Sequence, residues 1–185
     1  MGSPYSFRSA TIEDVPMLRR WLETHEVRRW WGDPAEQQAL IEEDLAGCVM
    51  TQLIVSLDGR PFAYAQHCEV HEWGESPFLH LPRGSRAIDP FIGEPDLLGR
   101  GHGPAFLRMI CDQLVVAGTP AIGIDPDVEN HRARSAYRKA GFVGEDVVET
   151  AEGPAVLMLF RSGHPSLESA LRSLDDGGPA PARLD

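Results

Sequence analysis

The segment Leu98-Gly99-Arg100-Gly101-His102-Gly103-Pro104 has the composition of an anion-binding turn. Its three glycines alternate with other residues directly before an expected helix, and Pro104 suits the first helical position, where its missing N–H costs nothing. Glycines let backbone N–H groups point at one place without side chains in the way, and a helix start adds free N–H groups and a positive dipole end. The segment therefore predicts a site for a phosphate or diphosphate, with a plain tight turn as the alternative.

A second informative segment covers residues 125–142. Asn130 is a good N-cap for a helix, and Gly141 follows that helix in the C′ position. Tyr137 lies at helical spacing from two alanines of the same helix, so core packing is the simplest role of its ring.

Two carboxylates stand out because of where they lie in expected strands. Asp89 is in the middle of the strand expected over residues 85–92, among apolar neighbours, where a carboxylate needs a reason to be. Asp125 ends the short strand expected over residues 121–125, directly before Pro126. The structural alternatives are hydrogen bonds from neighbouring backbone amides for Asp89, and a cap or turn for Asp125.

Length and composition indicate a soluble globular protein. The chain has 185 residues, 42% apolar and 24% charged, and no apolar run near the ~20 residues that span a bilayer. No signal peptide is visible and the three cysteines form no Cys-x-x-Cys pair, so we expect a cytoplasmic protein that binds no membrane. The net charge of −11 argues against nucleic-acid binding and permits cationic small molecules as ligands.

The rest of the chain supplies the elements that must position these residues. Periodicity, caps and turn residues predict an α/β protein, with a mixed sheet and helices on its faces. Strands are expected over residues 7–10, 53–57, 62–71, 85–92, 121–125, 142–150 and 155–160, and helices over 11–22, 33–45, from 104 onward, and over 130–140. Asp33 is expected to cap the second of these helices, and Asp58-Gly59-Arg60-Pro61 to join the second and third strands in a hairpin. We expect one domain over residues 5–161 and a tail over 162–185, which has room for a short helix and then reads as disordered.

Together, the glycine turn and the pattern Asn130-x2-Ala133-x3-Tyr137-x-Lys139-x-Gly141-Phe142 resemble the GCN5-related N-acetyltransferase superfamily, over about residues 5–160. The resemblance implies a central, mostly antiparallel sheet flanked by helices. It is closest to the aminoglycoside 6′-N-acetyltransferases, and the residues that carry this are Trp30-Trp31-Gly32, Tyr64-Ala65-Gln66, Arg86 to Asp89, Asp125-Pro126 and Glu152 to Val156. Residues 93–101 also look like the siderophore-biosynthesis acetyltransferases, which typically have His in place of Asp89.

The resemblance implies acetyl-CoA as the donor. The turn would hold the diphosphate mainly through backbone N–H groups, which makes Leu98 tolerable where the superfamily has Gln or Arg. Arg100 would add a charge contact, Asn130 would contact the pantetheine arm, and the His102 side chain is expected to be simply exposed. The donor-binding residues implied are Leu98, Gly99, Arg100, Gly101, His102, Gly103, Asn130 and Tyr137.

The same resemblance implies direct transfer to a primary amine of a cationic small molecule. Asp89 would bind the ammonium and take its proton, and the Tyr137 hydroxyl would protonate or hydrogen-bond the leaving thiolate. The substrate-binding residues implied are Trp31, Gln66, Glu72, Trp73, Glu75, Asp89 and Asp125. No metal is expected, although His67, Glu69 and His71 share one face of their expected strand.

Three functions remain open on the sequence alone. The first is acetylation of the 6′-amine of aminoglycosides. The second keeps the enzyme and changes the acceptor to a siderophore hydroxylamine, a polyamine or a peptide amine. The third is a non-catalytic acyl-CoA-binding sensor. The chain could act as a monomer or a homodimer.

Overall fold

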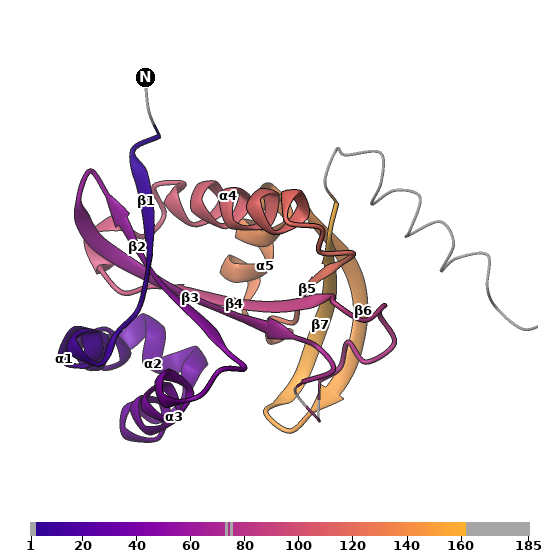
Figure 1. Cartoon of the computed structure of the whole chain (residues 1–185), viewed down its shortest axis with the longest axis horizontal. Helices are drawn as coiled ribbons and strands as arrows, with labels where there is room; N and C mark the ends of the chain where they lie inside the picture. The colour runs from indigo at the N-terminus through magenta and orange to yellow at the C-terminus, as the bar shows by residue number, and fades with distance from the viewer. Residues whose placement is uncertain (1–2, 73, 75, 162–185) are drawn as a thin grey trace, which may run out of the picture.

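The computed structural model describes residues 3–72, 74 and 76–161, which form a seven-stranded sheet with helices on both faces (Figure 1). The strand order is β1-β2-β3-β4-β5-β7-β6, and only the β4–β5 pair is parallel. This confirms the expected mixed, mostly antiparallel sheet. The strands are β1 (Tyr5–Ser9), β2 (Thr51–Leu57), β3 (Arg60–Glu69), β4 (Arg86–Ile92), β5 (Ile122–Ile124), β6 (Phe142–Thr150) and β7 (Gly153–Phe160).

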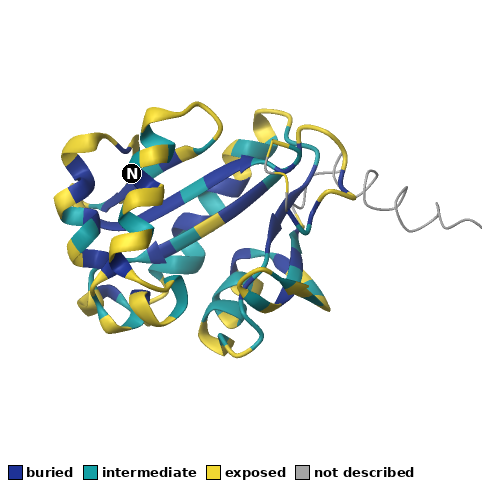
Figure 2. Ribbon diagram, turned by 90° about the horizontal axis from the view of Figure 1, so that it is seen from below, coloured by how far each residue is buried: buried dark blue, intermediate teal, exposed yellow. Residues whose placement is uncertain are grey.

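The helices divide into two groups on opposite faces of the sheet (Figure 1). One group is α1 (Val15–Leu22), α2 (His25–Trp31) and α3 (Pro34–Ala46), and the other is α4 (His102–Val116) and α5 (His131–Ala140). Short 3-10 turns precede α1 (η1, Ile12–Asp14) and α4 (η2, Pro95–Leu97). Alternate strand residues supply both cores, since Phe62 packs on the α4 side and Tyr64 on the α1–α3 side. Buried residues accordingly run along the strands in Figure 2.

Local signals placed most element ends correctly. The Asp33 carboxylate accepts hydrogen bonds from the first-turn N–H groups of α3, at 2.8 and 3.2 Å. Gly141 ends α5 in the left-handed conformation with φ +113°, as predicted for a C′ glycine. Asp58 and Gly59 both have positive φ, +48° and +83°, and join β2 to β3 in a two-residue hairpin.

The sequence analysis missed α2. This helix has seven residues, of which only Val27 is buried, so it lacks the repeating apolar face that identifies longer helices. Its position comes from tertiary packing: the Trp31 ring meets Phe91 edge-on, with centroids 4.8 Å apart, and also contacts Tyr64.

The β4–β5 pair opens after two residue pairs, Arg86 with Ile122 and Ala87 with Gly123. Beyond this point β4 stays paired with β3 as far as Ile92, whereas the chain after β5 follows β7. The Val156 N–H donates to the Pro126 carbonyl at 2.9 Å, and the Val128 N–H donates to the Pro154 carbonyl at 3.1 Å. The centre of the sheet is therefore split into a gap, with Asp89 on one side and Asp125 on the other.

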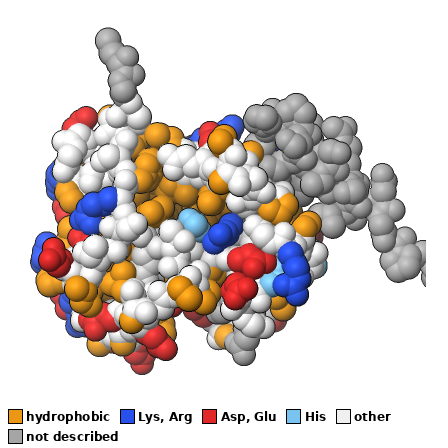
Figure 3. Space-filling model, viewed as in Figure 1, with side chains coloured by type: hydrophobic (Ala, Val, Ile, Leu, Met, Phe, Trp, Pro, Cys, Tyr) orange, Lys and Arg blue, Asp and Glu red, His pale blue; other side chains and the backbone are white. Residues whose placement is uncertain are grey.

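The predicted tail over residues 162–185 lies outside the described residues, and the domain boundary at 161 stays a prediction. No helix in the described ranges is long and apolar enough to cross a membrane. On the described part of the face in Figure 3, Lys and Arg side chains are scattered among Asp and Glu, without a continuous basic strip.

A substitution directly after β4 tests how closely α1 packs on the sheet. The Gly93 N–H donates to the Phe62 carbonyl at 2.8 Å, and a Cβ on Gly93 would overlap the Trp21 indole. Gly93→Ala should therefore lower the free energy of unfolding by about 1–3 kcal/mol in urea titrations. Gly47→Ala is the matched control, because its Cβ would make only an ordinary 3.5 Å contact with a backbone oxygen. Equal stability of the two variants would contradict the packing.

Candidate active site

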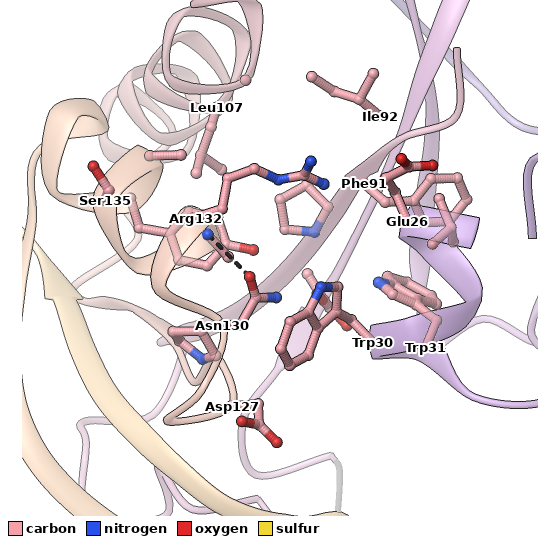
Figure 4. Close-up of a pocket in the computed structure, with 18 of the residues that line it drawn as sticks. Glu26, Trp30, Trp31, Phe91, Ile92, Leu107, Asp127, Asn130, Arg132 and Ser135 are labelled. Carbon is pink, nitrogen blue, oxygen red and sulfur yellow. Dashed lines mark hydrogen bonds between the residues drawn. The ribbon is translucent and has the colours of Figure 1, made fainter. Parts of the chain in front are cut away.

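Two cavities meet at the gap between β4 and β5. The first, which we call the turn cavity, has a volume of about 430 Å³ and lies between the glycine turn, α4 and α5 (Figure 4). The second, the helix cavity, has a volume of about 380 Å³ and is lined by α3, the end of β3 and the β6–β7 turn. Both volumes are typical of small-molecule sites. The residues that line both cavities are Trp30, Trp31, Asp89, Asp125, Pro126, Tyr137, Thr150 and Glu152.

The glycine turn lines the turn cavity with backbone rather than side chains. Gly99 and Gly101 are left-handed, with φ +72° and +87°, and a Cβ on either would meet no atom within 4 Å. The N–H groups of residues 99–103 donate to no turn or loop carbonyl, and the first N–H groups of α4 have no intrahelical acceptor. This open row of donors at a helix start fits an anionic group such as a diphosphate.

The helix begins two residues earlier than expected. Its first residue is His102, so Pro104 is the third helical residue and not the first. The difference is small in physical terms, because the third N–H of a helix also lacks an intrahelical acceptor and its absence in proline leaves no bond unmade.

Two residues of the turn do not reach the cavity. Arg100 is exposed and lies outside the residues that line it. The His102 side chain is not simply exposed, as the sequence analysis expected: its ring is half-buried, and its Nδ1 lies 2.8 Å from the Tyr5 hydroxyl. Leu98, Gly99, Gly101 and Gly103 do line the turn cavity.

The positive charges of the turn cavity come from α5 instead. Arg132 and Lys139 both line the cavity, and Figure 4 shows the Arg132 side chain extending into it between Leu107 and Phe91. The sequence analysis named Lys139 only as part of a motif, without a role for its charge, and did not consider Arg132. Their spacing could have indicated a shared basic face, because residues seven apart lie on the same face of a helix.

Asn130 and Tyr137 project from the same helix toward the gap. The Asn130 Oδ1 accepts the Ala133 N–H at 3.1 Å, which confirms the predicted N-cap and is the dashed line in Figure 4. Tyr137 lines both cavities while its ring packs against Phe142, with centroids 6.2 Å apart. Burial raises the pKa of Tyr137, and the charges of Asp89 and Asp125 add to the shift. The hydroxyl therefore stays protonated and is able to donate.

Three carboxylates, Asp89, Asp125 and Glu152, line the region where the two cavities meet. Asp89 is exposed, but the surface that it exposes borders cavities inside the gap, where protein surrounds the carboxylate. The surrounding protein displaces water from the carboxylate and, with the charges of Asp125 and Glu152, holds the pKa of Asp89 well above its usual range. Burial and Glu152 also raise the pKa of Asp125 to about 6. A cation bound among these groups would relieve the repulsion that raises both values.

The helix cavity gathers several of the predicted substrate residues. Trp31, Gln66 and Glu72 line it together with Asp89 and Asp125, and the Gln66 Oε1 accepts the Tyr64 hydroxyl at 2.8 Å. Trp73 and Glu75 lie outside the described residues. The cavity also holds contributors that the sequence analysis did not assign to the substrate site: Asp44 and three neighbours on α3, and Glu152 in the β6–β7 turn.

The histidine face of β3 contributes no further ligand set. Burial lowers the pKa of His67 to about 4, so its ring is neutral, and the His71 Nδ1 lies 3.2 Å from Glu69. Within residues 3–161, leaving out 73 and 75, no three His, Cys, Asp or Glu side chains group closely enough to hold a metal ion.

Comparison with known proteins gives a consistent result. Residues 11–150 match a family described as the acetyltransferase (GNAT) domain. The aminoglycoside N(6')-acetyltransferase type 1 of Klebsiella pneumoniae is 31% identical over 163 residues, which cover 83% of this chain and 81% of that protein. A solved structure of AAC(6')-Ib with paromomycin and acetyl-CoA is 30% identical, with a TM-score of 0.77, and covers 88% of this chain and 100% of that chain. Another, with coenzyme A and kanamycin, is 30% identical with a TM-score of 0.78, and covers 90% and 99%.

The raised pKa of Asp125 predicts a pH-dependent stability. Its value of about 6 in the folded protein lies above the ordinary 3.8, so ionisation opposes folding as the pH rises through this range. Asp125→Asn should therefore be more stable than the parent above pH 7, by up to about 3 kcal/mol, and the difference should vanish below pH 4.

Urea unfolding at a series of pH values measures this difference. The exposed Glu129→Gln variant removes one charge directly before Asn130, the N-cap of α5, and should show no such trend. If Asp125→Asn gave the same difference at pH 4 and pH 8, the assigned pKa would be wrong.

Proposed function

This chain belongs to the GNAT acetyltransferase family and is an acetyl-CoA-dependent N-acetyltransferase; we propose that its acceptor is the 6′-amine of an aminoglycoside. The observation that carries the proposal is the charge of the helix cavity, which meets the turn cavity at Asp89 and Tyr137. Its carboxylates are Asp44, Glu72, Asp89, Asp125 and Glu152, and no Lys or Arg is among its described lining residues. Such a cavity favours a ligand with several positive charges.

The turn cavity suits the acetyl donor. The open backbone N–H groups of residues 99–103, at the start of α4, support binding of a diphosphate, whereas the Leu98 N–H already donates to the Pro95 carbonyl at 3.2 Å. Arg132 and Lys139 supply positive charge to the same cavity, and Asn130 borders its inner part. The donor brings the activated acetyl thioester; the protein's own contribution is to hold and orient it toward the gap.

Asp89 is proposed to prepare the acceptor amine. An ammonium has no lone pair, so it must lose a proton before it can attack the thioester carbonyl carbon. Asp89 in its ionised form first pairs with the ammonium and then takes this proton, directly or through a water molecule. The raised pKa of Asp89 makes it a stronger base than an ordinary carboxylate.

Tyr137 is proposed to assist the leaving group. As the new C–N bond forms, the C–S bond breaks, and the sulfur takes up negative charge. The Tyr137 hydroxyl, which stays protonated in this environment, donates its hydrogen bond or its proton to that sulfur. The acetylated nitrogen loses its second proton, which replaces the one that Tyr137 gave to sulfur, so the products are the N-acetylated amine and the free thiol, without an acyl-enzyme intermediate.

An amine panel tests the acceptor. Thiol release from acetyl-CoA is measured with kanamycin, ribostamycin, spermidine, N-hydroxylysine and a lysine peptide. We expect the highest kcat/KM with the aminoglycosides, because their several ammonium groups match the carboxylates around the helix cavity. Faster turnover of one of the other amines would replace the proposed acceptor. Binding of acetyl-CoA in calorimetry without turnover of any amine would instead favour a sensor.

Substitution of the proposed base tests the mechanism. Asp89→Asn keeps the size of the side chain and removes its basicity, so kcat/KM should fall by roughly 10²–10⁴-fold while the Kd of acetyl-CoA stays nearly unchanged. Asp112→Asn, an exposed carboxylate paired with Arg108 on α4, is the matched control and should retain activity. Full activity of the Asp89→Asn variant would exclude this residue as the base.

A further inference from the structure

The glycine turn has one side-chain anchor. Gly99, Gly101 and Gly103 have no side chains, Arg100 is exposed, and within residues 99–105, all of which are described, only the His102 side chain makes a hydrogen bond. A turn with two left-handed glycines has many alternative conformations when it is free, so an anchor at this point restricts the whole segment.

The anchor is a cluster of three rings from distant parts of the chain. The Tyr5 hydroxyl lies 2.8 Å from the His102 Nδ1, and the two ring centroids are 6.0 Å apart. Phe62 of β3 packs against both, at 6.2 Å from Tyr5 and 5.8 Å from His102. Through this cluster the first residue of α4 is tied to β1, the edge strand that runs beside it in Figure 1.

The Tyr5 hydroxyl keeps its proton in these surroundings. Burial, and the charge of Asp58, raise the pKa of the Tyr5 hydroxyl. It shares one hydrogen bond with the His102 Nδ1, and the imidazole tautomer decides which of the two groups donates. Neither residue is among those that line the turn cavity, so neither side chain competes with a ligand for the backbone N–H groups.

We infer that Tyr5 and His102 are positioning residues that set the glycine turn in its ligand-binding conformation before acetyl-CoA arrives. The inference rests on the family's donor but not on the proposed acceptor. A preformed turn loses less conformational entropy when it binds, so the pair contributes to donor affinity without touching the donor. It has no role in proton transfer or in acceptor binding, because both groups lie outside the residues that line the helix cavity.

Tyr5→Phe is the direct test, because it removes one hydroxyl and keeps the ring against Phe62. The Kd of coenzyme A, measured by calorimetry with no acceptor present, should rise about fivefold, the range expected for loss of one hydrogen bond. The KM for acetyl-CoA should rise by a similar factor, whereas kcat and the KM of the acceptor should stay as in the parent.

A double-mutant cycle shows whether the two residues act through their shared bond. His102→Phe keeps an aromatic ring and removes the nitrogen that shares the hydrogen bond with Tyr5. If the pair acts as a unit, the Tyr5→Phe/His102→Phe variant should bind coenzyme A about as weakly as either single variant. Effects that multiply would show that the residues act separately and would overturn the inference.

Arg8→Gln is the matched control for general destabilisation of β1. Arg8 lies on β1 three residues after Tyr5 and pairs with Asp14 of η1 at 2.6 Å, so its loss should lower the melting temperature without changing the Kd of coenzyme A. If Arg8→Gln weakened coenzyme A as much as Tyr5→Phe did, the Tyr5 effect would be one of stability and the inference would fail. Failure of the parent protein to acetylate any aminoglycoside would leave these binding results untouched and would count only against the proposed acceptor.

Discussion

The separation of β4 from β5 is the constraint on which the site depends. Two residue pairs hold the strands together, and the chain then leaves β4 because it forms hydrogen bonds with β7 instead. Gly123 contributes to this arrangement, since a side chain there would overlap the Phe78 ring that packs over β5. A continuous ladder would fill the centre of the sheet with backbone. The split leaves room for two cavities that meet within the molecule, so that two ligands can approach one point from different directions.

The carboxylates where the two cavities meet destabilise the protein as long as no cation is bound among them. Burial is the main reason that the pKa values of Asp89 and Asp125 are raised, and repulsion among Asp89, Asp125 and Glu152 adds to it. A cation bound among the carboxylates replaces part of this repulsion with attraction. Stability and acceptor binding therefore have opposite requirements here. Variants that remove a carboxylate should have a higher free energy of unfolding at neutral pH and a lower affinity for a cationic acceptor. Such a conflict is typical of sites that must hold charge inside a protein.

Local sequence signals predicted what depends on a few neighbouring residues. The caps at Asp33 and Asn130, the Gly141 stop and the Asp58-Gly59 hairpin are each determined by one or two side chains, and the structure has them as expected. The features that the sequence analysis missed depend on tertiary packing. The α2 helix has little apolar periodicity of its own, and the direction of the His102 ring depends on Tyr5, almost one hundred residues earlier in the chain. Arg132 and Lys139 could have been recognised by their helical spacing, but only the position of α5 shows that their shared face lines the turn cavity.

The two cavities present different parts of the protein to the ligands proposed for them. The turn cavity presents main-chain N–H groups, which every sequence that adopts the turn will have; this explains why Leu98 is compatible with the site. The helix cavity presents side chains from α3, β3 and the β6–β7 turn, and each can change without altering the turn. The division has a consequence for variation within such a fold. In the proposed function, donor binding depends on backbone geometry, and hence on the glycines and on His102, whereas acceptor choice depends on side chains that single substitutions can change without altering the sheet and its central gap.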